Sequence, residues 1–217
     1  MLVLAVDTAT PAITAGVIEL GGAAPRVLGE RVTVDAKAHG ELLMPHVLRA
    51  LADADRELSD VDAVVCGVGP GPFTGLRAGM VTAAALGHSL DVPVHPVCSL
   101  DAIAAEAAGG AVLVATDARR KELYWASYDA GGARIAGPAV DRPEAIPTDG
   151  VTRVAGFGAR LHDFGLEVVG PAHPSPAGLV AAAADALRAN VSGAPLTPLY
   201  LRRPDATVPG ERKRVLR

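Results

Sequence analysis

Short apolar runs, each closed by Asp, Gly or Pro, alternate with longer amphipathic stretches through the first hundred residues. Short runs with such ends are typical of strands in a sheet. The pattern predicts five strands, at residues 2–6, 13–20, 26–34, 61–66 and 92–97. Because only turns separate the first three strands, they are expected to form two hairpins, and the later strands to lie parallel.

Two helices are predicted between these strands. The first runs from His39 to about residue 55, and Pro45 is expected to kink or restart it. Its apolar positions cover more than one face: Leu42, Leu43, Met44, Val47, Leu48, Leu51 and Ala52. The second helix spans residues 74–90 and carries small residues at steps of four: Gly79, Ala83 and Gly87. An ordinary surface helix buries a single apolar stripe, so the surplus predicts a further contact, either between the helices or with another chain.

A second, shorter series of elements follows Gly109-Gly110, which marks a domain boundary. Strands are predicted at 111–116, 125–128 and 151–155, and an Ala-rich helix at 179–189 with Ser175 as its cap. The order of elements predicts an α/β chain of two lobes. Residues 1–108 form the larger lobe, with the two helices that could bind a partner, and residues 109–217 form a smaller lobe and a basic tail.

The stretch between residues 64 and 79 is the most distinctive, because it passes from a buried strand through a loop of Gly and Pro into a helix. Such a loop can offer free N–H groups to a phosphate. The known phosphate-binding patterns do not match, since Thr74 stands where Gly-x-Gly-x-x-Gly needs its third glycine and no Lys follows Gly75. A tight turn that lets the next helix pack closely is therefore the favoured interpretation.

Composition narrows the function classes. The net charge of −4 argues against broad contact with a nucleic-acid backbone, and the 3% of aromatic residues predict no stacking platform for single-stranded RNA. Cys66 and Cys98 stand in apolar surroundings and are expected to be buried, inert thiols. The start of the chain lacks a signal-peptide pattern and no apolar run approaches membrane-spanning length, so a cytoplasmic protein is expected.

Three stretches of the chain resemble the TsaB (YeaZ) family. The first is Gly-Pro-Gly-x-Phe-Thr-Gly-Leu-Arg within residues 67–79, the second is Asp-Ala-Arg-x-x-Glu-x-Tyr at 117–124, and the third is Pro-Leu-Tyr-Leu-Arg at 198–202. The chain departs from the usual family pattern at Pro72, where Ser is common, and at Gly40, where Ser often follows the histidine. The resemblance implies a two-lobed actin-like ATPase (ASKHA) fold with a reduced second lobe.

The same resemblance implies a function. TsaB proteins are non-catalytic, dimerising subunits of the bacterial machinery that makes N6-threonylcarbamoyladenosine at tRNA position 37. This chain would then be a scaffold and activator for a TsaD-type threonylcarbamoyltransferase, with a TsaE-type ATPase as a further partner and tRNA reached only through the complex. The two helices would form the subunit interface. The residues expected in it are Leu43, Met44, Val47, Leu48, Leu76, Arg77, Met80, Ala83 and Gly87.

The sequence also gives expectations for a nucleotide site and a metal site, which involve different residues. No cofactor is expected on the isolated chain, although ATP or ADP could lie at an interface within the complex. The residues nearest to such a nucleotide would be Asp7, Thr10, Gly69, Gly71 and Thr74. Asp7 and Thr10 either approach a phosphate or cap their own turn. No metal site is expected, because His39 and His46 stand seven positions apart, roughly 10 Å along a helix.

Two other functions remain open from the sequence. One is a stand-alone actin-like kinase of small molecules or a metal-dependent, peptidase-like enzyme. Ala118 and Arg119 argue against it, because they put bulk where an ATP-using relative carries glycines. The loop at 156–159 could be a remnant of an adenosine-binding turn. The other is a homodimer with a binding role of its own, formed through the same two helices. The basic tail after Arg202 could touch tRNA or a partner.

Overall fold

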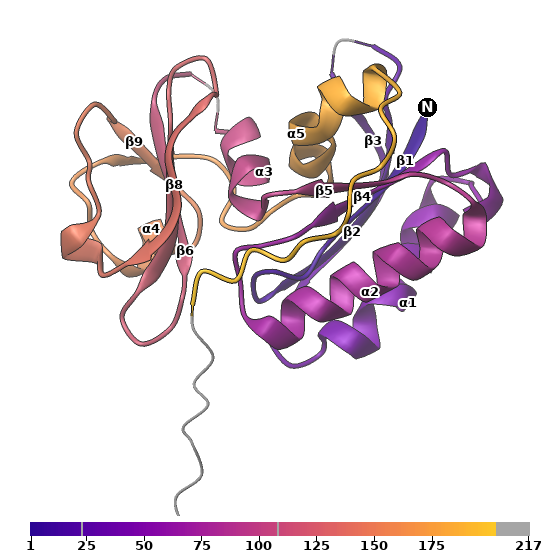
Figure 1. Ribbon diagram of the computed structural model, residues 1–217, viewed down its shortest axis with the longest axis horizontal. Coiled ribbons are helices and arrows are strands. Elements are labelled where there is room, and N and C mark those ends of the chain that lie inside the picture. The colour runs from indigo at the N-terminus through magenta and orange to yellow at the C-terminus, as the bar shows by residue number, and fades with distance from the viewer. Residues whose placement is uncertain (23, 108, 203–217) are drawn as a thin grey trace, which may run out of the picture.

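The computed structural model describes residues 1–22, 24–107 and 109–202, and it contains two five-stranded sheets that stand side by side (Figure 1). The first sheet has the order β3-β2-β1-β4-β5. Its strands are β1 (Leu2–Asp7), β2 (Ala12–Glu19), β3 (Arg26–Val34), β4 (Ala63–Gly67) and β5 (Val94–Val97). β1 lies at the centre, antiparallel to β2 and parallel to β4, because a tight turn leads to β2 and a helical crossover leads to β4.

The second sheet repeats this topology. Its order is β10-β9-β6-β7-β8, with β6 at the centre, antiparallel to β7 and parallel to β9. The strands are β6 (Val112–Asp117), β7 (Leu123–Tyr128), β8 (Arg134–Asp141), β9 (Arg153–Ala155) and β10 (Glu167–Val168). The two sheets thus share one plan, which the sequence predicted in outline although it shows no internal repeat.

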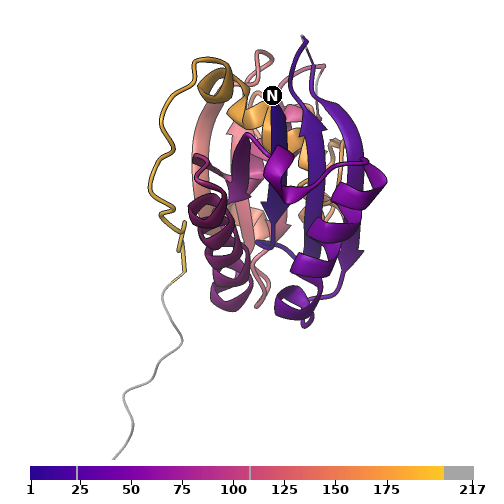
Figure 2. The same cartoon turned by 90° about the vertical axis from the view of Figure 1, so that its right-hand side faces the viewer.

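Helices cover both faces of the first sheet. α1 (His39–Asp53) and α2 (Phe73–Leu90) lie side by side on one face, and α5 (Pro176–Arg188) lies on the other (Figure 2). α3 (Ser99–Ala105) packs between α5 and the second sheet, and the other face of that sheet carries the short α4 (Gly158–Leu161) and two loops. Single-turn 3₁₀ helices occupy Leu58–Asp60 and Pro143–Ala145. None of the helices in the described part of the chain is long and apolar enough to cross a bilayer.

Alternation along β1 divides the core of the first lobe into two layers. Leu4 and Val6 point toward α1 and α2, whereas Val3 and Ala5 point toward α5. All four side chains are fully buried. Burial of a Leu or Val side chain contributes about 1.5–3 kcal/mol, so a strand with two apolar faces needs helices on both sides. This requirement explains why the near-continuous apolar run at 2–6 forms the central strand.

Most of the predicted elements are present, with some corrections. Pro45 does not restart α1, which is one continuous helix. Pro45 has no N–H to donate a hydrogen bond to the Glu41 carbonyl. Because both residues are exposed, water can donate to that oxygen instead. Ser175 caps α5 as predicted, since its hydroxyl accepts from the Gly178 amide at 2.9 Å. β8, β10 and α4 were not predicted.

The chain returns to the first lobe at its end. α5 packs on the first sheet, and residues 191–202, which we call the strap, follow it past β5 and α2. The Leu199 amide donates to the Val68 carbonyl at 2.9 Å. The expected division at 108/109 therefore separates the two sheets, but residues 176–202 complete the first lobe. The predicted role of the basic tail beyond residue 202 lies outside the described residues.

Candidate functional site

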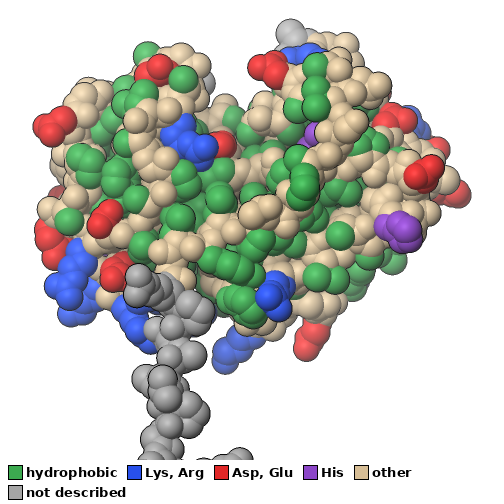
Figure 3. Space-filling model, viewed as in Figure 1, with side chains coloured by type: hydrophobic (Ala, Val, Ile, Leu, Met, Phe, Trp, Pro, Cys, Tyr) green, Lys and Arg blue, Asp and Glu red, His purple; other side chains and the backbone are tan. Residues whose placement is uncertain are grey.

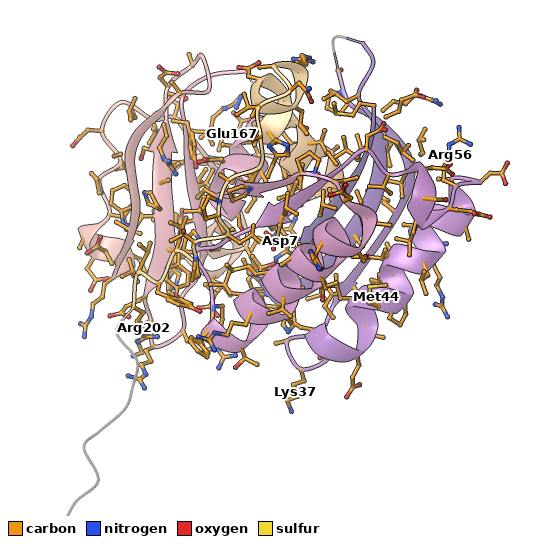
Figure 4. The ribbon with its side chains drawn as sticks, turned by 45° about the vertical axis from the view of Figure 1, so that its right-hand side comes forward. Asp7, Lys37, Met44, Arg56, Glu167 and Arg202 are labelled. Atoms are coloured by element: carbon orange, nitrogen blue, oxygen red, sulfur yellow. The ribbon has the colours of Figure 1, made fainter. Side chains whose placement is uncertain are left out.

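The carboxyl ends of β1 and β4 meet at Asp7, at the centre of the molecule (Figure 4). Asp7 is completely buried. One of its oxygens, Oδ1, accepts from the Ala9 amide at 2.8 Å, and Oδ2 accepts from the Ser99 hydroxyl at 2.5 Å. Burial raises the pKa of Asp7 to about 6, although the bonds from Ser99 and Ala9 partly oppose this shift. The carboxyl group is thus held entirely by its own chain.

The glycine loop after β4 lies directly against the turn that follows Asp7. A Cβ on Gly71 would lie 2.8 Å from the Ala9 carbonyl carbon and closer still to its oxygen, and a Cβ on Gly75 would lie 2.6 Å from the Thr8 oxygen. The Thr8 hydroxyl donates to the Gly75 carbonyl at 2.7 Å and accepts from the Gly79 amide at 2.9 Å. The glycines therefore serve close packing of α2 onto the β1–β2 turn, as the favoured interpretation predicted.

The residues expected near a nucleotide are mostly engaged within the chain. Asp7, Gly69 and Gly71 are buried, and the Thr10 hydroxyl accepts from the Ala12 amide at 3.2 Å, which is the turn-capping role. Thr74 alone is exposed, in the first turn of α2. The structure thus brings four of these five residues together at one junction, and their contacts fill the space between the loop and Asp7.

The second lobe has the corresponding turn. Asp117 ends β6 as Asp7 ends β1, and its Oδ1 accepts from the Arg119 amide at 2.8 Å. The turn after β9, at 156–159, also packs closely, because a Cβ on Gly158 would lie 2.9 Å from the Ala115 carbonyl carbon. Phe157 in that turn stacks on His173 with ring centroids 5.4 Å apart. The expected adenosine-binding remnant is a packed turn in this structure.

The two histidines of α1 have different partners. His39 Nε2 contacts the Thr10 carbonyl oxygen at 2.9 Å, and His46 Nε2 contacts the Thr33 hydroxyl at 2.9 Å. No three metal-ligating side chains gather anywhere within 1–22, 24–107 or 109–202. Both cysteines are buried, and burial raises the pKa of the Cys66 thiol and brings that of Cys98 to about 11. Such thiols are poor nucleophiles at neutral pH.

Most residues expected at the partner interface lie in the core of this chain instead. They are Leu43, Val47, Leu76, Met80, Ala83 and Gly87, of which Met80 is the most accessible of the apolar side chains at 8%. The apolar members of this set pack between α1, α2 and the first sheet. Their surplus apolar character reflects contact with the sheet and with the neighbouring helix, so these residues offer no surface to a partner in this fold.

The opposite sides of α1 and α2 are exposed and apolar. Leu48 on α1 is 52% and Val81 on α2 67% exposed, and Met44 on α1 is half-buried (Figure 4). We call this exposed surface the outer face, and its residues are Met44, Pro45, Leu48, Val81 and Ala84. Only Met44 and Leu48 of this set were predicted as interface residues. Val81 was not among the predicted interface residues; it follows the buried Met80 by one position, which turns its side chain about 100° around the helix and away from the core.

Arg77 lies in a separate cluster at the start of α2. Its guanidinium carbon is 4.0 Å from the centre of the Phe73 ring, and its Nε donates to the Tyr200 hydroxyl at 3.3 Å. Phe73 and Tyr200 stack with centroids 5.3 Å apart and remain 51% and 42% exposed. We call Phe73, Arg77 and Tyr200 the aromatic shelf. The sequence predicted no stacking platform for single-stranded RNA, and no local pattern indicated this pair of exposed rings, because they come from distant parts of the chain.

A cavity of about 550 Å³ opens on the other side of the second lobe, between α3, α5 and the β7–β8 turn. Small residues line most of it, and its charged residues are Asp129, Asp185 and the ion pair of Arg134 and Asp101 at 3.1 Å. The Tyr128 hydroxyl donates to Asp101 at 2.7 Å. None of the predicted site residues lies in this cavity.

Comparison with known proteins gives consistent results. The family model for tRNA N6-adenosine threonylcarbamoyltransferase (TsaD) matches residues 21–155. The chain is 57% identical over 205 residues to an uncharacterized protein of Mycobacterium leprae, and this match covers 94% of the chain and 56% of that protein. It is 35% identical over 130 residues to the tRNA threonylcarbamoyladenosine biosynthesis protein TsaB of Bacillus subtilis.

That second match covers 59% of the chain and 55% of the Bacillus subtilis protein. The chain therefore spans only about half the length of these two curated relatives. Among solved structures, YeaZ from Pseudomonas aeruginosa superposes with a TM-score of 0.77 at 27% identity, over 92% of this chain and 99% of that one. The likeness to YeaZ extends over both lobes and confirms the actin-like (ASKHA) α/β fold.

Proposed function

Because this chain belongs to the TsaD family, as one of its TsaB (YeaZ) members, we propose that it serves the synthesis of N6-threonylcarbamoyladenosine at tRNA position 37. It does so in the cytoplasm as a non-catalytic subunit that pairs with a TsaD-type threonylcarbamoyltransferase. The observation that carries the proposal is the exposed apolar outer face of α1 and α2. Exposed apolar patches of this kind mark sites of association.

The closed junction at Asp7 supports a subunit without its own catalytic centre. An ATP-using actin-like enzyme needs open backbone beside this carboxylate, and here Gly71 and Gly75 bring the loop into direct contact with Ala9 and Thr8. In the second lobe, Ala118 and Arg119 follow Asp117. Any ATP or ADP would accordingly lie at an interface within the complex, where a TsaE-type ATPase would also join, and tRNA would be handled by the assembled subunits.

The outer face defines the test. Leu48→Arg and Val81→Arg each place a charge at an exposed apolar position, whereas Met80→Arg would disrupt the core and report only on folding. Ile135→Arg is the matched control, because Ile135 is 60% exposed on β8 of the second lobe. Mixing each variant with the TsaD-type protein from the same cell and measuring mass by light scattering should show a heterodimer with wild type and with Ile135→Arg.

Leu48→Arg and Val81→Arg should weaken that heterodimer by about 2–4 kcal/mol, the range of an interface hot spot. If wild type gives no complex at micromolar concentration, with or without nucleotide, the pairing is refuted. If the two variants abolish only self-association, the face serves a homodimer. ATP turnover by the isolated chain, lost in Asp7→Ala, would favour the enzyme alternative instead.

A further inference from the structure

Two features that the pairing function does not use lie at the same end of the molecule. One is the aromatic shelf, and the other is the β6–β7 turn with Arg119, Arg120 and Lys121, which we call the cationic tip. The strap joins them: two residues after Tyr200, Arg202 pairs with Glu122 at 3.0 Å and donates to the Ala118 carbonyl at 2.7 Å. Two residues of chain span at most roughly 7 Å between Cα atoms, so the strap brings Tyr200 of the shelf and Arg202, which contacts the tip, to the same end of the molecule.

The space-filling view agrees with this placement. Lys and Arg side chains are prominent along the lower edge of the molecule, with a few acidic side chains among them (Figure 3). Figure 4 labels Arg202 and Lys37 at this edge and Arg56 at the opposite end. The net charge of −4 therefore conceals a locally basic end.

The cationic tip has a backbone that glycine or asparagine would adopt more readily. Arg119, Arg120 and Lys121 have φ angles of 62°, 52° and 61°, all in the left-handed region. Each such residue costs roughly 1–2 kcal/mol relative to glycine in steric terms. All three are exposed, so no core packing accounts for long side chains there. Strained backbone of this kind occurs where function requires the residues.

The aromatic shelf offers complementary chemistry. Phe73 and Tyr200, stacked on each other, keep exposed ring surface on which a planar base can stack, and the Arg77 guanidinium lies over the Phe73 ring. The carboxylate nearest to the strap, on Glu122, is already paired with Arg202, and the Asp117 carboxylate accepts from the Arg119 amide. Exposed rings beside a row of cations are the combination that proteins use for single-stranded nucleic acid.

We propose that this end of the molecule binds single-stranded RNA, with a base stacked on the aromatic shelf and the adjoining phosphates held by the cationic tip. The inference deepens the proposed function, on which its choice of RNA rests: the subunit would contribute directly to holding the tRNA. An acidic protein surface could pair with the tip, but it would leave the exposed rings of Phe73 and Tyr200 without a matching group.

The test uses the full chain, alone and with its TsaD-type partner, and a labelled 12-nucleotide oligoadenylate as probe in fluorescence anisotropy. Phe73→Leu keeps an apolar side chain but removes the ring, and Phe73→Tyr restores it. Lys121→Glu reverses one charge of the tip, and Arg56→Glu makes the same change at the far end. Circular dichroism and thermal melting establish that each variant is folded.

Phe73→Leu should weaken RNA binding about tenfold and Phe73→Tyr should recover it, as expected for one stacked base. Lys121→Glu should weaken binding and lower the slope of log K against log salt by about one, whereas Arg56→Glu should match wild type. Binding that neither Phe73→Leu nor Lys121→Glu changes would overturn the proposal. So would variants that bind RNA normally but lose the protein partner, because the end would then be a protein interface.

The two proposals fail in different ways. A normal heterodimer that binds no RNA, or binds it regardless of these variants, refutes the RNA site and leaves the pairing intact. RNA binding that depends on Phe73 and Lys121, in a chain that forms no heterodimer, refutes the pairing and leaves the RNA site intact.

Discussion

The two lobes carry the same turn in opposite settings. Asp7 and Asp117 each end the central strand of a sheet, and each accepts from the amide two residues further on at 2.8 Å. Asp7 is fully buried beneath the glycine loop and α2, whereas Asp117 is only half-buried and its turn continues into three exposed cations. One plan thus gives a sealed junction in the first lobe and an open, charged end in the second.

The difference follows from what covers each sheet. Long helices lie over both faces of the first sheet, so the residues around its central turn must be small enough to pack, and glycines stand at the contact. Within the described residues, the second sheet carries the short α4 and loops on its outer face, and the strap reaches the β6–β7 turn through Arg202. Long, exposed side chains are accommodated there, and four substitutions test this contrast.

Gly71→Ala should have the largest effect, because its Cβ would collide with the backbone of Ala9, which cannot move without displacing β1 and β2. We expect a loss of at least about 3 kcal/mol in the free energy of unfolding. Urea denaturation measures it, with Gly40→Ala as control, since nothing lies within 4 Å of a Cβ on Gly40. Equal stability of the two variants would show that the junction is looser than described.

Asp7→Asn should change the pH dependence of stability. The pKa of Asp7 is raised from 3.8 to about 6 in the folded chain, so between these values the folded state binds the proton more tightly and stability falls as pH rises. Relative to Asn, which does not titrate, wild type should lose on the order of 2–3 kcal/mol between pH 4 and pH 7. Unfolding of both proteins across this range is the measurement, and a constant difference would contradict the raised pKa.

Arg202→Ala should release the strap from the second lobe. The side chain pairs with Glu122 and donates to the Ala118 carbonyl while about three-quarters buried, so we expect a loss of about 1–2 kcal/mol. Arg26→Ala is the control, because its pair with Glu19 is exposed and screened by solvent, so its loss should leave stability nearly unchanged. Thermal denaturation distinguishes the two, and equal losses would show that the strap is not anchored by Arg202.

Lys121→Gly should have the smallest effect on stability, and it should stabilise the protein rather than destabilise it. Glycine adopts the left-handed backbone of the cationic tip without steric cost, and after its own entropy loss we expect a gain of about 0.5–1 kcal/mol. The same variant should weaken RNA binding. A variant that is less stable than wild type would show that the Lys121 side chain makes contacts that hold the turn.

The sequence predicted the first lobe better than the second, for physical reasons. Buried strands such as 2–6 and 61–66 are apolar throughout, and so they stand out, whereas β8 (Arg134–Asp141) is half-exposed and lacks an apolar run. The tight glycine loop after β4 was also predictable, because Gly and Pro residues interrupt the apolar strand there and favour a turn. The exposed side of α1 and α2 was not predictable, since a helix packed on both a sheet and a neighbouring helix has apolar residues on several sides, and only the fold shows which side is left exposed.

The aromatic shelf was beyond any local pattern. Phe73 and Tyr200 are unremarkable singly, and they meet only because α5 and the strap return to the first lobe. The cationic tip was visible as Arg-Arg-Lys, but its left-handed backbone and its place next to the shelf were not. Sites assembled from distant segments need the tertiary fold before their chemistry becomes apparent.

The return of α5 to the first sheet also has a consequence for synthesis on the ribosome. Val3, Ala5 and Val65 face α5, whose Leu179 and Leu187 cover them. When residue 108 leaves the ribosome, all strands of the first sheet have been made, but this face has no cover until residue 188 follows. One apolar face of the amino-terminal half therefore stays exposed, and accessible to chaperones, until α5 has been synthesised and packs on it.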